Sequence, residues 1–331
     1  MNKQLLTRLF RSIEGDKSDD IVKVAYTIIE DENVRGHEKL ATQLKSILEH
    51  NLKNHSNYNN ELRRILPEGV SIPTDKRNNL PLATVIERDD LRHEMVLNSD
   101  IEEKIKRIEK EFVARERLAH FGLKPRQKIL LYGSSGCGKS MSAERIAWNI
   151  GLPFLKVRFE AIISSYLGES ANNLKILFES LKTYPCVLLL DEFDFIAKSR
   201  TSSQEVGEMH RVVNILLNLL EEYDASGLII ATTNLEGMID KALFRRFDDV
   251  IEITRPQEQE IAKILENTLS AMRLSKDVNL NVIAKDMIGF SAALSVKVAN
   301  DAAKLAVISG KSEVGLIHFK KSLSENKAYN H

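Results

Sequence analysis

The chain has 331 residues, which favours about two domains and is long enough to bury a sizeable apolar core. Its 47 basic and 47 acidic residues cancel, so no overall charge draws it to nucleic acid or to a membrane surface. Two cysteines make no disulfide framework, no signal-peptide core is seen near the start, and no apolar run approaches the roughly 18 residues of a membrane span. We therefore expect a cytoplasmic protein with no membrane partner.

Residues 1–54 are predicted to be helical. Apolar residues recur at helical spacing in three stripes, at 5–13, 21–29 and 40–48. Such stripes are typical of a small helical bundle, and equally of helices that pack on a partner or on the rest of the chain. We expect this region to recruit a substrate or partner.

Residues 55–96 are predicted to be a partly irregular linker, because prolines and scattered charges interrupt any periodic pattern. A short strand is expected within it at 83–86. After the linker, Ser99 and Glu102 have the spacing of a capping box, which predicts the start of a helix.

Strand-like apolar runs alternate with amphipathic helices over residues 97–255. This alternation predicts a mainly parallel sheet that binds its ligand at the carboxyl ends of the strands. From residue 256 to 331 only helical patterns are expected, so a small helical domain should follow the α/β core.

A glycine-rich loop follows the apolar strand at 129–132 and leads into a helix. In this context the pattern G-x-x-x-x-G-K-S predicts a phosphate-binding loop, and a glycine-rich turn with a chance Lys-Ser is the weaker alternative. Its glycines allow backbone N–H groups to face a phosphate. Lys139 is expected to reach the β- and γ-phosphates of ATP, and the Ser140 hydroxyl to bind Mg²⁺. The residues expected to bind the nucleotide are Gly133, Ser134, Ser135, Gly136, Cys137, Gly138, Lys139, Ser140 and Met141.

Two acidic residues follow the buried strand at 187–190. Asp191 is expected to complete the Mg²⁺ site beside Ser140, and Glu192 to orient and deprotonate the attacking water. Asn234 follows the next strand, where its amide can hold that water or the γ-phosphate, although a turn asparagine is the commoner role for such a residue. Arg245 and Arg246 precede the last strand, and adjacent arginines are usually solvated.

Four segments together resemble the AAA branch of the AAA+ ATPase family: GSSGCGKS, VLLLDEFD, ATTN and IDKALFRRFDDVIEI. The resemblance covers about residues 97 to 310. It implies ATP hydrolysis with Mg²⁺ on a five-stranded parallel P-loop sheet with a C-terminal helical lid, in a chain that assembles as a hexameric ring. It also implies that Asn234 is a sensor, and that Arg245 and Arg246 are arginine fingers for the neighbouring subunit.

The segment from Ser165 to Ser170 resembles the family's first pore loop. The tip that would grip a passing chain is Tyr166, Leu167 and Gly168, and a core tyrosine is the alternative. A second pore loop is expected within 199–208.

The lid segment departs from the family pattern. Ala292 replaces a glycine and Leu294 replaces an acid, and Lys297 is a weak candidate for a lid sensor.

The function that these motifs favour is a ring motor that threads, unfolds or remodels polypeptide. Single-module chains of this kind commonly work with a separately encoded protease or adaptor, which the resemblance implies as a partner. A nucleic-acid-associated ATPase such as a loader is the alternative, which the balanced charge and the Tyr-Leu-Gly tip disfavour. A scaffold with incidental turnover and a small-molecule kinase are weaker alternatives.

Overall fold

The computed structural model describes residues 25, 28–29, 41–42, 44–46, 48, 73–74, 80–162, 169–183, 185–193, 206–234 and 244–327. The chain forms two units, residues 1–70 and 71–331. In the first unit the described residues are helical, and those of the second and third apolar stripes include the buried Ala25, Leu44 and Leu48. The first stripe lies outside the described residues.

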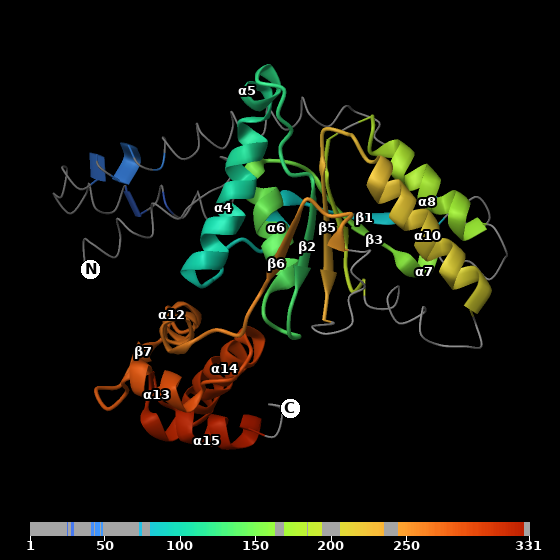
Figure 1. The fold of residues 1–331 in the computed structure, drawn as a ribbon. Coiled ribbons are helices and arrows are strands. Elements are labelled where there is room, and N and C mark those ends of the chain that lie inside the picture. The colour runs from blue at the N-terminus through green and yellow to red at the C-terminus, as the bar shows by residue number, and fades with distance from the viewer. Residues whose placement is uncertain are drawn as a thin grey trace. The chain divides into compact units, whose positions relative to one another are not determined.

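A mainly parallel sheet forms the centre of the second unit (Figure 1). In the part of the chain that the structure describes, this sheet has six strands in the order β1-β3-β4-β5-β2-β6. Their bounds are β1 Ala83–Ile86, β2 Lys128–Tyr132, β3 Phe154–Val157, β4 Val187–Leu190, β5 Leu228–Thr233 and β6 Asp249–Glu252. Strands β2 to β6 are parallel, which confirms the predicted P-loop sheet, and β1 adds an antiparallel edge strand beside β3 at the position expected from the sequence.

Helices cover both faces of this sheet, with α4 and α6 on one side and α8 and α10 on the other (Figure 1). The central strands are apolar on both faces because both are covered; all four residues of β4 and all six of β5 are buried. The helical elements of this part are η1 Arg88–Asp90, α4 Ser99–Val113, α5 Arg115–His120, α6 Lys139–Ile150, α7 Phe159–Ile162, α8 Glu169–Ser180 and α10 Val206–Glu222.

The start of α4 corrects one prediction. The helix does begin at Ser99, but its cap is the side chain of Asn98, which accepts hydrogen bonds from the backbone N–H groups of Asp100 and Ile101. Glu102 is turned instead toward Arg145 of α6, because a bidentate ion pair competes with the capping box for the same carboxylate.

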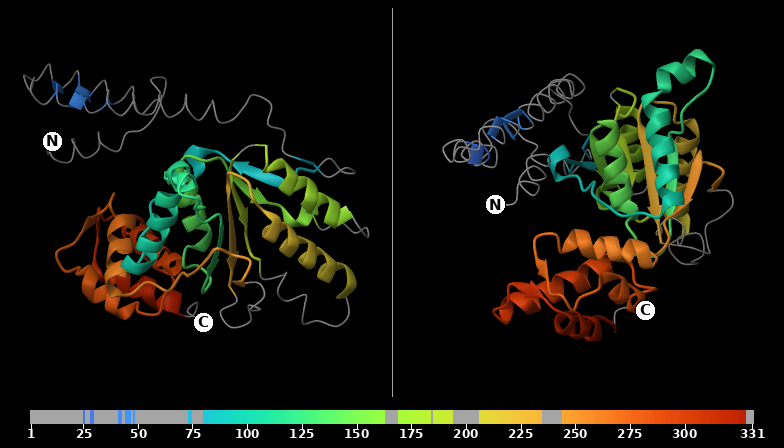
Figure 2. Two further views of the ribbon diagram at one scale, coloured as in Figure 1. Left: turned by 45° about the horizontal axis from the view of Figure 1, so that its top comes forward. Right: turned by 90° about the vertical axis from the view of Figure 1, so that its left-hand side faces the viewer.

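The helical lid follows β6 as a separate group of helices (Figure 2). It has its own apolar core. Its elements are α12 Glu258–Thr268, β7 Arg273–Leu274, α13 Leu280–Asp286, α14 Ala292–Ile308, β8 Glu313–Val314 and α15 Leu316–Asn326. The expectation of an all-helical lid was wrong in one detail, because β7 and β8 form a parallel pair. Among the helices that the structure describes, none has both the length and the apolar character needed to span a membrane.

Candidate nucleotide site

The predicted phosphate loop runs from Gly133 to Gly138, between the end of β2 and the start of α6. Gly133 has a φ of +139°, and a Cβ there would lie 2.3 Å from the carbonyl oxygen of Ile253. Gly136 has a φ of +74°, a left-handed conformation that L side chains rarely adopt. The loop thus needs glycine at both positions, and it ends at the N-terminus of a 12-residue helix, where unpaired N–H groups favour an anion.

Lys139 is buried at the start of α6, and its ammonium group points back into the loop. It donates hydrogen bonds to the carbonyl oxygens of Gly133 and Ser134, at 2.8 and 2.9 Å, and to Oδ1 of Asn234 at 2.7 Å. The fold therefore brings together two predicted site residues that are 95 positions apart in the sequence. An ammonium group so placed can exchange these oxygen acceptors for those of a phosphate.

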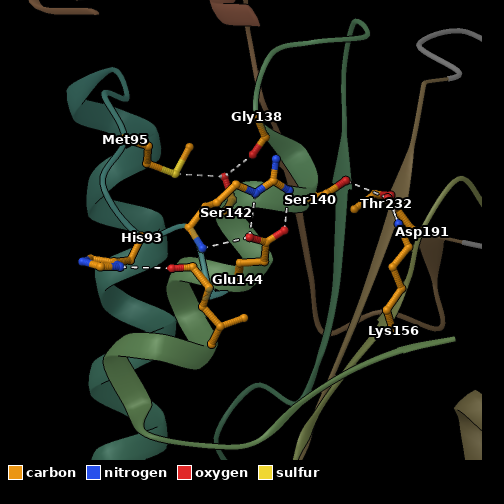
Figure 3. Close-up of polar contacts among 11 residues, drawn as sticks. His93, Met95, Gly138, Ser140, Ser142, Glu144, Lys156, Asp191 and Thr232 are labelled. Atoms are coloured by element: carbon orange, nitrogen blue, oxygen red, sulfur yellow. Dashed lines mark hydrogen bonds and ion pairs between the residues drawn. The ribbon is translucent and has the colours of Figure 1, made fainter. Parts of the chain in front are cut away.

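Asp191, immediately after β4, accepts hydrogen bonds on both carboxylate oxygens (Figure 3). Oδ1 accepts from the hydroxyls of Ser140, at 2.7 Å, and Thr232, at 2.6 Å, and Oδ2 accepts from the ammonium group of Lys156 at 2.6 Å. Burial alone would raise the pKa of Asp191, but the hydrogen bonds from Lys156, Thr232 and Ser140 outweigh it and lower the pKa. Asp191 is therefore ionised at neutral pH.

Ser140 and Asp191 fit the Mg²⁺ site expected of them. Hydroxyl and carboxylate oxygens are ligand types that Mg²⁺ accepts, and adjacent ligands of an octahedral ion with bonds of roughly 2.1 Å lie roughly 3 Å apart. The 2.7 Å between the two side chains is close to that spacing. Across the described ranges no three His, Cys, Asp or Glu side chains gather into a metal cage.

Glu192 lies one residue beyond Asp191 and has an unusual backbone. Its φ is +54°, in the left-handed region that costs a non-glycine residue about 1–2 kcal/mol. Its backbone N–H donates to the hydroxyl of Thr232 at 3.1 Å, and its side chain is exposed. The Thr232 hydroxyl thus donates to one predicted carboxylate residue and accepts from the backbone of the other.

The lid contacts the phosphate loop through the start of α14. The backbone N–H of Ala293 donates to the carbonyl oxygen of Gly136 at 2.9 Å, and a Cβ on Gly136 would lie 2.9 Å from Ser291 Oγ. Ala292 lines a small cavity of about 10 Å³ together with Cys137 of the loop. The departure from the family pattern at Ala292 therefore lies where lid and loop meet.

A larger cleft, of about 460 Å³, lies beside α6 and has the volume of a small-molecule site. It is lined by residues 93–97, by Glu102 of α4, by Arg145 and Asn149 of α6, and by Lys263 of α12. Residues 93–97 also run beside the phosphate loop, since Met95 Cε lies 3.1 Å from where a Cβ of Gly138 would be.

The segment that lines this cleft is fixed to α6, although its sequence predicted irregular chain. Both the backbone N–H and the Nε of Arg92 donate to Glu144 of α6, at 3.0 and 2.8 Å. The ring of His93 stacks on the ring of Trp148, with centroids 3.9 Å apart and planes 5° apart. No local pattern indicates these pairs, because each joins residues more than 50 positions apart.

The two predicted arginine fingers lie in the turn before β6. Arg246 Nη2 forms an ion pair with Glu221 Oε2 of α10 at 3.0 Å, whereas Arg245 is exposed. This ion pair joins Arg246 to α10 of its own chain. The pore-loop residues Tyr166, Leu167 and Gly168, and most of 199–208, lie outside the described residues.

Comparison with known proteins agrees with this geometry. A family model described as ATPase family associated with various cellular activities (AAA) matches residues 129–255. The chain is 32% identical over 324 residues to the uncharacterized AAA family ATPase y4kL of Sinorhizobium fredii, covering 97% of this chain and 94% of that protein.

Two longer relatives match only part of their length. The ATP-dependent zinc metalloprotease FtsH of Aquifex aeolicus is 31% identical over 232 residues, which are 68% of this chain and 37% of that protein. The proteasome-activating nucleotidase 2 of Haloferax volcanii is 32% identical over 206 residues, which are 60% of this chain and 50% of that protein.

Proposed function

Because this chain belongs to the AAA family of ATPases, we propose that it is a ring-forming motor that spends ATP hydrolysis on threading or remodelling polypeptide. The observation that carries the proposal is the set of polar side chains gathered at the carboxyl ends of β2, β4 and β5. Lys139 and Asn234 share one hydrogen bond there, and Ser140 and Asp191 share another. Two relatives whose names couple a nucleotide or ATP to proteolysis support a polypeptide as the substrate.

Each of these side chains has a distinct task in hydrolysis. The loop N–H groups and the Lys139 ammonium bind the β- and γ-phosphates, and Ser140 and Asp191 hold Mg²⁺. When bound, Mg²⁺ supplies charge neutralisation at the phosphate oxygens. The Glu192 carboxylate orients the attacking water and accepts its proton, and Asn234 reports whether a γ-phosphate lies beside Lys139. Residues 93–97, which run beside the phosphate loop, and Lys263 of the lid line the cleft that would be open to the base and sugar of ATP.

The remaining charge in the transition state is neutralised by an arginine of the neighbouring subunit. Arg245 is the better candidate of the two, because it is exposed while Arg246 is paired with Glu221. Such a finger contributes on the order of 10³–10⁵ in rate. The ring is proposed to be a hexamer, and a monomer is expected to turn over slowly.

The experiment that tests this arrangement mixes two inactive variants. Arg245→Ala/Arg246→Ala lacks the donated arginines, and Glu192→Gln lacks the acceptor of the water's proton. Mixed rings should regain part of the phosphate release, because some pockets then combine an intact Glu192 with an intact arginine pair. No rescue at any mixing ratio would refute the contribution between subunits. Single Arg245→Ala and Arg246→Ala variants then assign the finger.

A separate experiment tests the polypeptide substrate. Glu192→Gln protein bound to ATP should form a stable ring with polypeptide in its channel. Electron microscopy can then count the subunits of this ring. Tyr166→Ala should bind nucleotide and lose polypeptide processing. Rings that never hold or process any polypeptide, including one delivered by a separately encoded protease or adaptor, would contradict this part of the proposal. Residues 1–54 are proposed to recruit the substrate or partner, so their removal should weaken capture.

A further inference from the structure

Lys156 is a charged residue in the otherwise buried strand β3, and its ammonium group reaches the predicted metal ligand Asp191. Lys156 pairs in register with Leu189 of β4, so Asp191 is its neighbour two residues further along that strand. Nζ of Lys156 lies 2.6 Å from Oδ2 of Asp191, and the side chains are 45% and 14% exposed. A long side chain that could extend into solvent is thus paired with a largely buried carboxylate.

With this contact, both carboxylate oxygens of Asp191 have hydrogen-bond donors within the chain. The hydroxyls of Ser140 and Thr232 are bonded to Oδ1, and the ammonium group is bonded to Oδ2 (Figure 3). A divalent cation bound by Ser140 and Asp191 would lie within a few ångströms of that ammonium group. Like charges at such a distance repel strongly at a partly buried site, and less so once anionic phosphates lie between or beside them.

We propose that Lys156 is a built-in counter-cation of Asp191 that opposes binding of a divalent metal until a nucleotide arrives with it. The inference rests on the proposed nucleotide site. Lys156 is a positioning residue: it acts on the metal through Asp191 and through its charge. Lys156 would weaken metal binding to the free protein more than to the nucleotide-bound protein. By linkage, this difference strengthens the coupling between metal binding and nucleotide binding.

The variant Lys156→Met removes the charge while keeping a long unbranched side chain. The probe is Mn²⁺ added to nucleotide-free protein, with free Mn²⁺ read by electron paramagnetic resonance. Lys156→Met should bind Mn²⁺ at least tenfold more tightly than the unmodified chain, whereas Lys156→Arg, which keeps the charge, should match the unmodified chain. Lys156→Gln is a second neutral variant for the case that Met is not tolerated.

Arg158→Gln is the matched control. It removes one positive charge two residues along the chain, and the partner of Arg158 is Glu160, at 3.0 Å, instead of Asp191. This variant should leave Mn²⁺ affinity within about twofold of the unmodified chain, because the Arg158 charge is already balanced by Glu160 and the Lys156–Asp191 ion pair is kept. An equal gain in Arg158→Gln would mean that general charge, and not the ion pair, sets the affinity.

A second readout is the affinity for a fluorescent ATP analogue with EDTA and with Mg²⁺. The dissociation constant with EDTA, divided by that with Mg²⁺, measures how much the metal strengthens nucleotide binding. This ratio should be at least tenfold smaller for Lys156→Met than for the unmodified chain. Unchanged Mn²⁺ affinity and an unchanged ratio would overturn the role of Lys156 while leaving the nucleotide site standing. Failure of the unmodified chain to bind the analogue under either condition would instead contradict the proposed function.

Discussion

Removing the Thr232 hydroxyl should uncouple nucleotide binding from hydrolysis. This hydroxyl is buried on β5, donates to Asp191 at 2.6 Å and accepts from the backbone N–H of Glu192 at 3.1 Å. Thr232→Val keeps the shape of the side chain and removes both bonds. Asp191 keeps Ser140 and Lys156, but Glu192 loses a contact that helps to hold its left-handed backbone, and its carboxylate is then free to drift.

The expected size of the effect follows from these contacts. Of the two lost bonds, the one to the ionised Asp191 is the stronger, because a hydrogen bond to a charged group contributes about 1.5–3 kcal/mol. About 1.4 kcal/mol corresponds to a tenfold change in rate. If the loss appears mainly in the transition state, kcat should fall roughly 10- to 150-fold.

The assay is steady-state phosphate release together with binding of a fluorescent ATP analogue. Affinity for the analogue should change less than about threefold, since the hydroxyl contacts the carboxylate residues and not the loop. Thr232→Ser, which keeps the hydroxyl, should restore most of kcat. If Thr232→Ser were as slow as Thr232→Val, or if Thr232→Val kept kcat within about threefold of the unmodified chain, the positioning role would be refuted.

Three further predictions concern the loop, the lid and the α4–α6 ion pair. Gly136→Ala should weaken nucleotide binding and loosen the lid, because its Cβ would lie 2.9 Å from Ser291 Oγ; limited proteolysis of the lid and analogue titration measure both effects. Gly133→Ala should be more damaging, since its Cβ would lie 2.3 Å from a backbone oxygen, and a melting temperature equal to that of Gly136→Ala would contradict this ranking. The pKa of Glu102 is lowered, first by its hydrogen bond from Arg145. The ion pair therefore stabilises the fold fully at a pH above the unfolded pKa of about 4.3. This stabilisation is lost as the pH falls through the lower pKa of the folded state. Chemical denaturation should therefore find Glu102→Gln less stable than the unmodified chain at pH 7, with the difference shrinking below about pH 4, and a constant difference across that range would contradict the assignment.

Local patterns in the sequence predicted the parts of the site that depend on neighbouring residues. The phosphate loop and the strand that ends at Asp191 could be read directly, because a loop–helix junction and an apolar run followed by acids are local signals. The short strand β1 was expected at its observed position for the same reason.

The contacts of Lys156 and Thr232 could not be predicted in this way. Each depends on which strands are neighbours and on their register, since β4 lies between β3 and β5 and brings Asp191 within reach of both side chains. A single lysine in the apolar run of β3 was the one available signal. The capping residue of α4 was misassigned because Asn98, one residue earlier, caps the helix, while Glu102 bonds to Arg145 far away in the sequence.

The hydrogen bond from Ala293 to the Gly136 carbonyl has a mechanical consequence. A loop whose amide groups turn inward to meet an anion directs some of its carbonyl groups outward, and one of these is bonded to the first turn of α14. While this bond holds, a rotation of that peptide plane would shift the end of a 17-residue helix that is roughly 25 Å long. A bond of about 1 kcal/mol is weak enough to break and re-form in every cycle, so the lid can follow the loop without being locked to it.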